Sequence, residues 1–127
     1  MTVMLMDNET DDVVFDINFW HYRAIVEAIR SLRVLPDDHV DRLHEPFTGS
    51  GLTKDECLIV AKELHARLVS TLDQDDRLLL DGTVTKEPDD GVFHKTDIEW
   101  QKNYSTNRTV IAAFVDAIRK SNGFTVC

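Results

Sequence analysis

The sequence predicts an α+β fold in which three main helices and one short helix pack on a small antiparallel sheet, made of an N-terminal hairpin and a C-terminal strand. Two observations carry this prediction. Apolar residues occupy every second position near the N-terminus, which is the period of a half-buried strand. In three longer segments they recur every three or four positions, which is the period of a helix with one buried face. With 127 residues and 43% apolar content, residues 1–127 are expected to form a single globular domain.

The two N-terminal strands are expected at about residues 2–6 and 12–17. Val13, Phe15 and Ile17 alternate along the second strand, and the polar run DNETDD between the strands is typical of a turn. The last four residues, FTVC, have strand composition, so we expect them to pair with this hairpin.

The helix starts are marked by capping residues. Asn18 suits an N-cap, and the first helix is expected to run from there to about Arg33, followed by a short helix at about 37–44. The clearest start is the capping box Thr53-Lys54-Asp55-Glu56, in which the Thr hydroxyl and the Glu carboxylate each accept a backbone amide. This helix is expected to run to about Leu72.

The segment 73–97 has two interpretations. The turn dipeptide Asp81-Gly82, flanked by leucines and by Thr-Val-Thr, suits a hairpin, and the same residues suit an irregular loop anchored by three leucines. A second capping box at 96–99 is another helix-start signal. The last helix is expected over about 106–121, and Asn122-Gly123 ends it because glycine readily adopts the left-handed conformation.

Acidic residues outnumber basic ones by 23 to 14, which gives a net charge of −9. The excess lies in predicted turns and loops: residues 1–17 carry −5, residues 36–53 carry −3 and residues 73–100 carry −6. This composition excludes a binder of the nucleic-acid backbone, which needs clustered positive charge. The sequence shows no secretory signal, no run of 18 apolar residues and only two cysteines. We therefore expect a cytoplasmic protein that does not contact membranes.

Motifs for catalysis, metals and cofactors are absent from the sequence. The run from Asp73 begins like a calcium loop, but Arg77 and Leu78 stand where that loop needs an oxygen ligand and a glycine. We therefore expect no metal, no cofactor and no enzymatic activity. The alternative is a small enzyme or metal-binding protein that uses histidines with nearby aspartates, and its candidates are His21, His39, His44 and His94.

Two groups of side chains are candidates for binding a partner. Tryptophan and tyrosine are enriched at the energetic centres of interfaces. Acidic loops attract a basic surface on a partner and raise the rate of association. We expect the acidic surface of this chain to be formed by residues 7–16, 37–45 and 73–97. The aromatic candidates are Trp20, Tyr22, Trp100 and Tyr104, and the acidic candidates are Asp73, Asp75, Asp76, Asp89 and Asp90.

Three segments resemble a loose group of small, acidic, uncharacterised bacterial proteins: Val14-Phe15-Asp16-Ile17-Asn18-Phe19-Trp20, the helix that follows Leu52, and Gly123-Phe124-Thr125-Val126-Cys127. The resemblance implies the α+β fold and no activity. Acidity, aromatic residues and missing catalytic motifs favour a non-catalytic interaction module for a basic protein partner, of which an immunity or inhibitor protein is one form. A homodimer that uses the aromatic helix is a further alternative.

Overall fold

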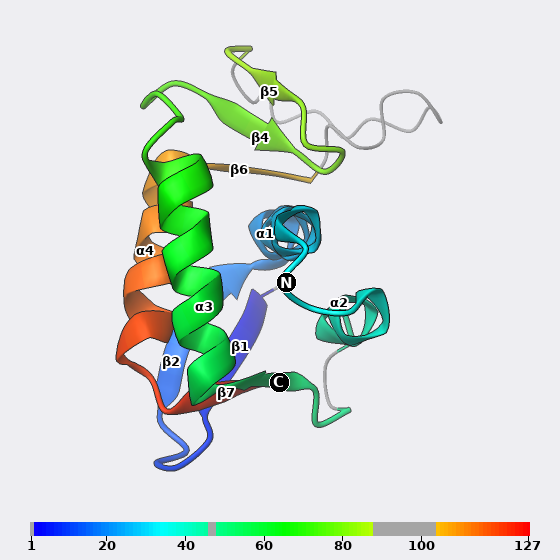
Figure 1. Cartoon of the computed structure of the whole chain (residues 1–127), viewed down its shortest axis with the longest axis vertical. Coiled ribbons are helices and arrows are strands. Elements are labelled where there is room, and N and C mark those ends of the chain that lie inside the picture. The colour runs from blue at the N-terminus through cyan, green and yellow to red at the C-terminus, as the bar shows by residue number, and fades with distance from the viewer. Residues whose placement is uncertain (1, 46–47, 88–103) are drawn as a thin grey trace.

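The computed structural model describes residues 2–45, 48–87 and 104–127. As predicted, the fold is α+β, and its helices pack against two small antiparallel sheets. In chain order the elements are β1 (Thr2–Asp7), β2 (Val13–Asn18), α1 (Phe19–Leu32), α2 (Asp37–Leu43), β3 (Gly51–Thr53), α3 (Lys54–Leu64), the π-helical turn η1 (His65–Val69), β4 (Arg77–Leu79), β5 (Val84–Thr85), β6 (Ser105–Asn107), α4 (Arg108–Lys120) and β7 (Gly123–Val126). Figure 1 shows α1 between the two sheets, α3 and α4 side by side along one flank, and α2 on the other.

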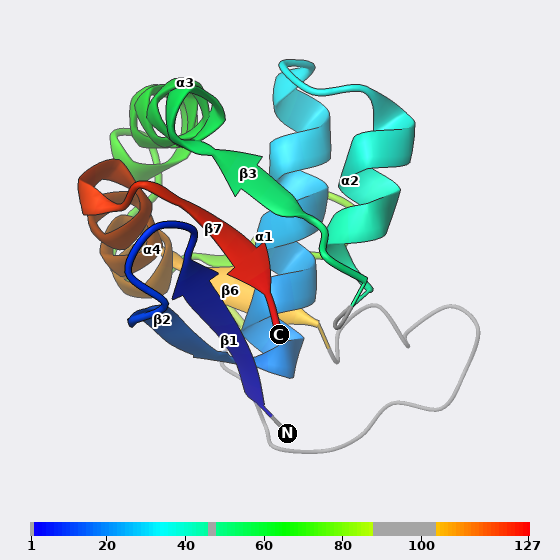
Figure 2. The same ribbon diagram turned by 90° about the horizontal axis from the view of Figure 1, so that it is seen from below.

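The first sheet has the strand order β2-β1-β7-β3, which can be followed in Figure 2. In the hairpin Val3 lies opposite Ile17 and Leu5 opposite Phe15, and Leu5 also lies opposite Val126 of β7. The predicted hairpin and its pairing with the C-terminal strand are therefore confirmed. The strand β3 was not predicted, because three residues are too few to show a period.

The helix starts follow the predicted caps, whereas one helix end does not follow the prediction. Asn18 accepts a first-turn amide at 2.7 Å, and the two bonds of the capping box at Thr53 form at 2.8 and 3.2 Å. The helix α3 ends at Leu64, and the chain continues as the π-helical turn η1 instead of a regular helix to residue 72. Arg108 braces this turn by donating from Nε to the Val69 carbonyl at 2.8 Å.

The second sheet decides between the two interpretations of residues 73–97 as far as the structure describes that segment. The strands β4 and β5 form a hairpin around Asp81-Gly82, and the strand β6, which was not predicted, pairs with the other edge of β4. The last helix begins later than predicted because Asn107 is its N-cap and accepts the Val110 amide at 2.9 Å. The helix-start signal at 96–99 lies outside the described residues.

The core lies between the helices and the inner face of the first sheet. Phe114 of α4 is fully buried there, with the rings of Phe15 and Phe124 edge-on to it at 5.9 and 6.4 Å. Cys57 is also fully buried, and burial raises the pKa of its thiol to about 11, as expected of a structural rather than a nucleophilic cysteine. Within the described ranges, none of the helices has the length and apolar content needed to cross a bilayer.

Candidate interaction surface

Two of the predicted aromatic residues, Trp20 and Tyr104, meet in the folded chain. Trp20 lies in the first turn of α1 and Tyr104 directly precedes β6, and their ring centroids are 4.9 Å apart. Phe19 packs edge-on against both rings at 6.2 and 6.3 Å, and the Arg23 guanidinium lies 4.7 Å from the Tyr104 ring centroid. Trp20 remains 36% exposed, so this aromatic cluster reaches the surface.

Tyr22 is a core residue, which corrects its selection as a surface anchor. It is 2% exposed, and its hydroxyl donates to the Leu43 carbonyl at 2.7 Å, which joins α1 to α2. Burial raises the pKa of Tyr22 above its usual range. The physical reason is its place on the apolar face of α1, where its ring is buried with that face and its hydroxyl finds a backbone acceptor.

The carboxylates of Asp73, Asp75 and Asp76 converge, but a lysine occupies the space between them. Oxygens from the three lie within 4.8 Å of one another. The Lys86 ammonium donates to Asp73 and Asp75 at 3.2 Å each and to Asp76 at 2.8 Å. These bonds, that to Asp76 first, raise the pKa of Lys86, and the same bond lowers the pKa of Asp76. Part of the acidity of this segment is therefore neutralised within the chain.

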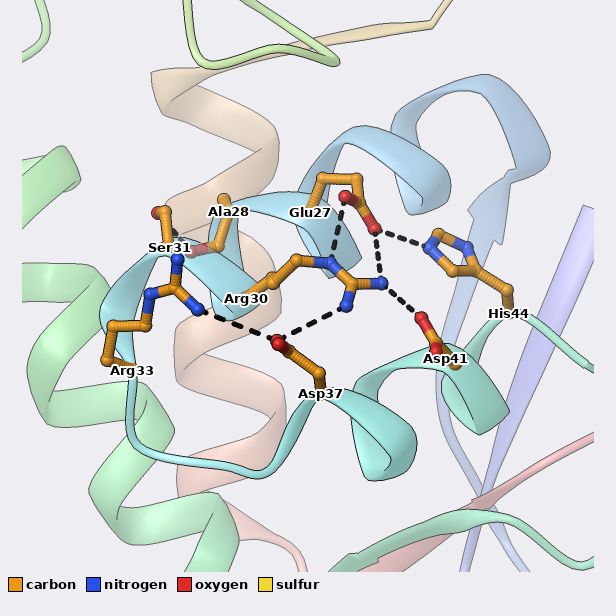
Figure 3. Close-up of polar contacts among 8 residues, drawn as sticks. All are labelled: Glu27, Ala28, Arg30, Ser31, Arg33, Asp37, Asp41 and His44. Carbon is orange, nitrogen blue, oxygen red and sulfur yellow. Dashed lines mark hydrogen bonds and ion pairs between the residues drawn. The ribbon is translucent and has the colours of Figure 1, made fainter.

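The acidic residues of α2 are paired as well. Arg30 of α1 contacts Asp37 at 3.3 Å and Asp41 at 2.5 Å, as Figure 3 shows, and Arg42 lies 3.4 Å from Asp38 one turn away. These carboxylates therefore connect α2 to α1 and to its own next turn, and they offer less charge to a partner than their number indicates.

Glu27 stands at the centre of the same network. Its carboxylate accepts two bonds from Arg30, at 3.0 and 3.2 Å, and lies 2.7 Å from Nε2 of His44 (Figure 3). Burial raises the pKa of Glu27, but the bonds from Arg30 and His44 outweigh burial, and the net pKa is below its usual value. The bonds to Glu27 and Asp41 in turn raise the pKa of Arg30. The network is thus a charged connection between two helices.

A pocket of about 390 Å³ opens beside this network, between α1 and the β4–β5 hairpin. Leu68 of η1 and the leucines at 78–80 supply its apolar wall. The charged residues Glu27 and Arg30 in its wall already bond to each other. This bond lies within α1, and the further contacts of the same two side chains with Asp41 and His44 connect α1 to α2 and the residue that follows it.

The histidines proposed for an enzyme or metal site have separate partners. His44 faces Glu27, His39 Nε2 lies 2.8 Å from the Gly51 carbonyl oxygen, and His21 Nδ1 lies 3.2 Å from the Thr106 hydroxyl. Across residues 2–45, 48–87 and 104–127, Asp73, Asp75 and Asp76 form the one group of three side chains with metal-ligand geometry. Four further candidates lie outside the described residues: His94, Trp100, Asp89 and Asp90.

The hairpin formed by β1 and β2 carries acidic side chains that have no such partners. Glu9, Asp11 and Asp12 in the turn and Asp16 on β2 are all exposed. None of these four, which we call the hairpin carboxylates, forms an ion pair with the part of the chain that the structure describes. Of the three acidic segments expected from the sequence, residues 7–16 therefore keep most of their charge for a partner.

Asp7 holds the turn that presents these carboxylates. It is 7% exposed, and it accepts the Asn122 amide at 3.0 Å and the Glu9 and Thr10 amides at 2.8 and 3.1 Å. These bonds, that from Asn122 first, lower the pKa of Asp7 to about 2. The turn is therefore tied to the connection between α4 and β7, and the hairpin carboxylates project from a fixed backbone.

Asp7 is expected to make stability depend on pH. Its folded pKa lies below the usual value of 3.8, so its contribution is present above about pH 4 and is lost as the pH falls toward about 2. Asp7→Asn places an amide donor against the Asn122 amide, and we expect Tm to fall by about 5–10 °C at pH 7. The fall in Tm between pH 5 and pH 2, measured by circular dichroism, should be smaller in this variant. Asp12→Asn, which removes the same charge from the same turn, serves as the control, and equal losses in both variants would contradict the assignment.

No protein-family model, curated protein or solved structure matches the chain.

Proposed function

We propose that this protein is a non-catalytic interaction module that binds a protein partner through a basic surface on that partner. The observation that carries the proposal is the set of hairpin carboxylates, Glu9, Asp11, Asp12 and Asp16, which are exposed and have no ion pair in the described chain. In α2 and in residues 73–76, by contrast, the carboxylates form ion pairs with Arg30, Arg42 and Lys86.

Electrostatics give such a surface a defined role. Four like charges on one hairpin repel one another and slightly destabilise the fold, and a partner with Lys or Arg side chains relieves that repulsion. Complementary charge also speeds association and makes it sensitive to salt. An inhibitor or immunity protein that covers the basic site of a toxin or nuclease needs this behaviour, and we propose that class of role for the module.

The aromatic cluster supports the same proposal. Trp20 is the second residue after Asn18, where β2 ends. Its exposed indole therefore lies just beyond the end of the strand that carries Asp16. Interfaces commonly combine a ring of charge with an aromatic anchor, because the charge guides the encounter and the aromatic surface supplies affinity. Arg23, which lies over Tyr104, fixes the ring that Trp20 packs against.

The test removes the hairpin charge and compares it with an equal removal elsewhere. The variant Glu9→Gln/Asp11→Asn/Asp12→Asn loses three charges, and Asn also suits the left-handed backbone of Asp11, whose φ is 59°. The control Asp38→Asn/Asp73→Asn/Asp75→Asn loses three charges that Arg42 and Lys86 already neutralise. Both variants and the parent are immobilised and exposed to lysate of the source cells at about 0.05 M and about 0.5 M salt.

We expect a basic protein to be retained on the parent and the control at low salt and released at high salt. Its retention on the hairpin variant should fall by about tenfold. Equal retention on all three proteins, retention that ignores salt, or retention of no protein at all would each contradict the proposal.

A further inference from the structure

Among the described residues no strand pairs with the outer side of β2, the first strand in the order β2-β1-β7-β3, and the directions of its backbone groups can be assigned. Met4 exchanges both backbone hydrogen bonds with Cys127, so the Met4 N–H and C=O face β7. Asp16 lies opposite Met4 on the other side of β1. In an antiparallel sheet the N–H and C=O of one residue both point toward the same neighbouring strand. Because those of Met4 point toward β7, Met4 and Asp16 form a pair without hydrogen bonds between them. The N–H and C=O of Asp16 therefore point outward, away from the sheet.

The opposite edge of the sheet is closed. There β3 has three residues, and His39 of α2 lies 2.8 Å from the carbonyl oxygen of Gly51. No corresponding side chain bonds to the outer edge of β2 within the described chain. A bulge at Val14, where the register with β1 shifts, confines the regular part of the open edge to Phe15–Asn18. That part is long enough to pair with a short extended segment.

The side chains along this edge specify the chemistry of such a segment. The side chains of Asp16 and Met4 lie on the face of the sheet that points away from the core. Met4 and Val13 are 38% and 51% exposed. A lysine or arginine opposite Asp16 places its charge beside that carboxylate, on the face of the sheet that also carries Met4 of β1 and Val13 of β2. The next side chain along the segment turns to the other face, beside the half-buried Phe15, and an apolar residue fits there.

We propose that β2 binds an extended segment of the partner as a fifth strand of the first sheet, with a basic residue opposite Asp16 and apolar residues at the alternate positions. The inference rests on the proposed function and adds its mode of recognition. Bonds to the N–H and C=O of Asp16 and to the N–H of Asn18, whose C=O belongs to the first turn of α1, provide the pairing. The hairpin carboxylates select a basic segment over other strands.

A second copy of this chain fits the same edge poorly. Antiparallel pairing of two β2 strands brings two copies of Asp16 close together and adds the turn carboxylates of both chains to one sheet. Like charges opposed across strands destabilise the pairing. The charge therefore selects a basic partner segment and disfavours a dimer formed through β2.

The experiment uses a synthetic ten-residue peptide in which lysine and valine alternate. A second version carries N-methyl groups at alternate residues, so that the peptide edge facing β2 has no N–H groups. Binding is measured by calorimetry and by amide shifts and hydrogen exchange of the labelled protein. Two variants separate charge from pairing. Asp16→Asn removes the charge and keeps the N–H. Asp16→Pro removes both, and because that N–H points outward it breaks no bond within the sheet.

We expect protection of the Asp16 and Asn18 amides on binding, with affinity about threefold lower for Asp16→Asn and at least about tenfold lower for Asp16→Pro. N-methylation should weaken binding to the unchanged protein by at least about tenfold, which tests pairing without altering the fold. Sedimentation should show one protein chain per complex.

Strand addition is overturned if the peptide shifts only the turn amides, if Asp16→Pro equals Asp16→Asn, or if N-methylation has no effect. Those results leave the proposed function intact, because the hairpin carboxylates then bind basic groups without pairing. Strand addition is also overturned if no peptide binds at low salt, or if the protein forms a dimer through β2. The lysate experiment with the three-charge variants decides the proposed function independently.

Discussion

Replacing Gly123 by alanine is expected to lower the free energy of unfolding by about 3 kcal/mol or more, among the largest effects of any single added methyl group in this chain. Gly123 has a φ of +89°, a conformation that costs a side-chain-bearing residue about 1–2 kcal/mol. A Cβ there would also lie 2.6 Å from the Leu52 carbonyl oxygen and 2.9 Å from the Lys54 amide nitrogen. Both are backbone atoms, the first in β3 and the second in the first residue of α3, so relief of the clash moves β7 away from β3.

Gly82 provides a matched control for this prediction. It has nearly the same φ, +90°, and no atom would lie within 4 Å of an added Cβ. Gly82→Ala therefore incurs the backbone cost alone, and we expect a loss of about 1 kcal/mol. Urea unfolding of the two variants measures the difference, which isolates the steric part. Equal losses in both variants would show that the close packing of β7 against β3 does not limit the fold.

The parts of the fold that follow from neighbouring residues were predictable. Asn18 accepts an amide two residues along, and Thr53 and Glu56 exchange bonds across one turn, so a short stretch of sequence contains the whole signal. Local chemistry decides these two helix starts, and the structure confirms them. Gly123 has the positive φ that its residue type favours, but α4 ends at Lys120 with Ser121 as an extended C-cap, so Gly123 begins β7 and does not cap the helix.

The parts that depend on partners distant in sequence were not predictable. The strands β3 and β6 have three residues each and exist because β7 and β4 lie beside them. The turn η1 keeps the apolar spacing of a helix, and its departure from regular geometry accompanies the bond from Arg108, which lies in α4. Periodicity carries no information about either kind of contact.

The candidate site shows the same division. The charge of each segment indicates where the acidic stretches are. It does not indicate that Lys86 forms ion pairs with Asp73, Asp75 and Asp76, or that Arg30 forms them with Asp37 and Asp41. Only folded geometry separates carboxylates that hold the chain together from those that remain for a partner. The orientation of the Asp16 backbone is likewise set by the pairing of Met4 with Cys127 at the far side of β1.

Replacing Phe114 by alanine is expected to remove about 4 kcal/mol of stability, the largest effect we predict for a side-chain truncation. Phe114 is 0% exposed and contacts the rings of Phe15 on β2 and Phe124 on β7, so its loss leaves a cavity between α4 and two strands of the first sheet. Phe114→Leu retains most of the volume, and we expect it to cost about 1.5 kcal/mol. Urea unfolding of both variants provides the comparison.

The control Phe15→Ala removes the other partner of the same ring contact. Phe15 is only half-buried, so its truncation removes less contact, and we expect a loss of about 2 kcal/mol. A larger loss for Phe15 than for Phe114 would mean that β2 contributes more to the core than burial indicates. The expected order instead makes β2 a strand that the core holds through Ile17 and one face of Phe15, while its outer edge contributes little to stability. An edge of that kind can exchange solvent for a partner strand without disturbing the residues that keep the chain folded.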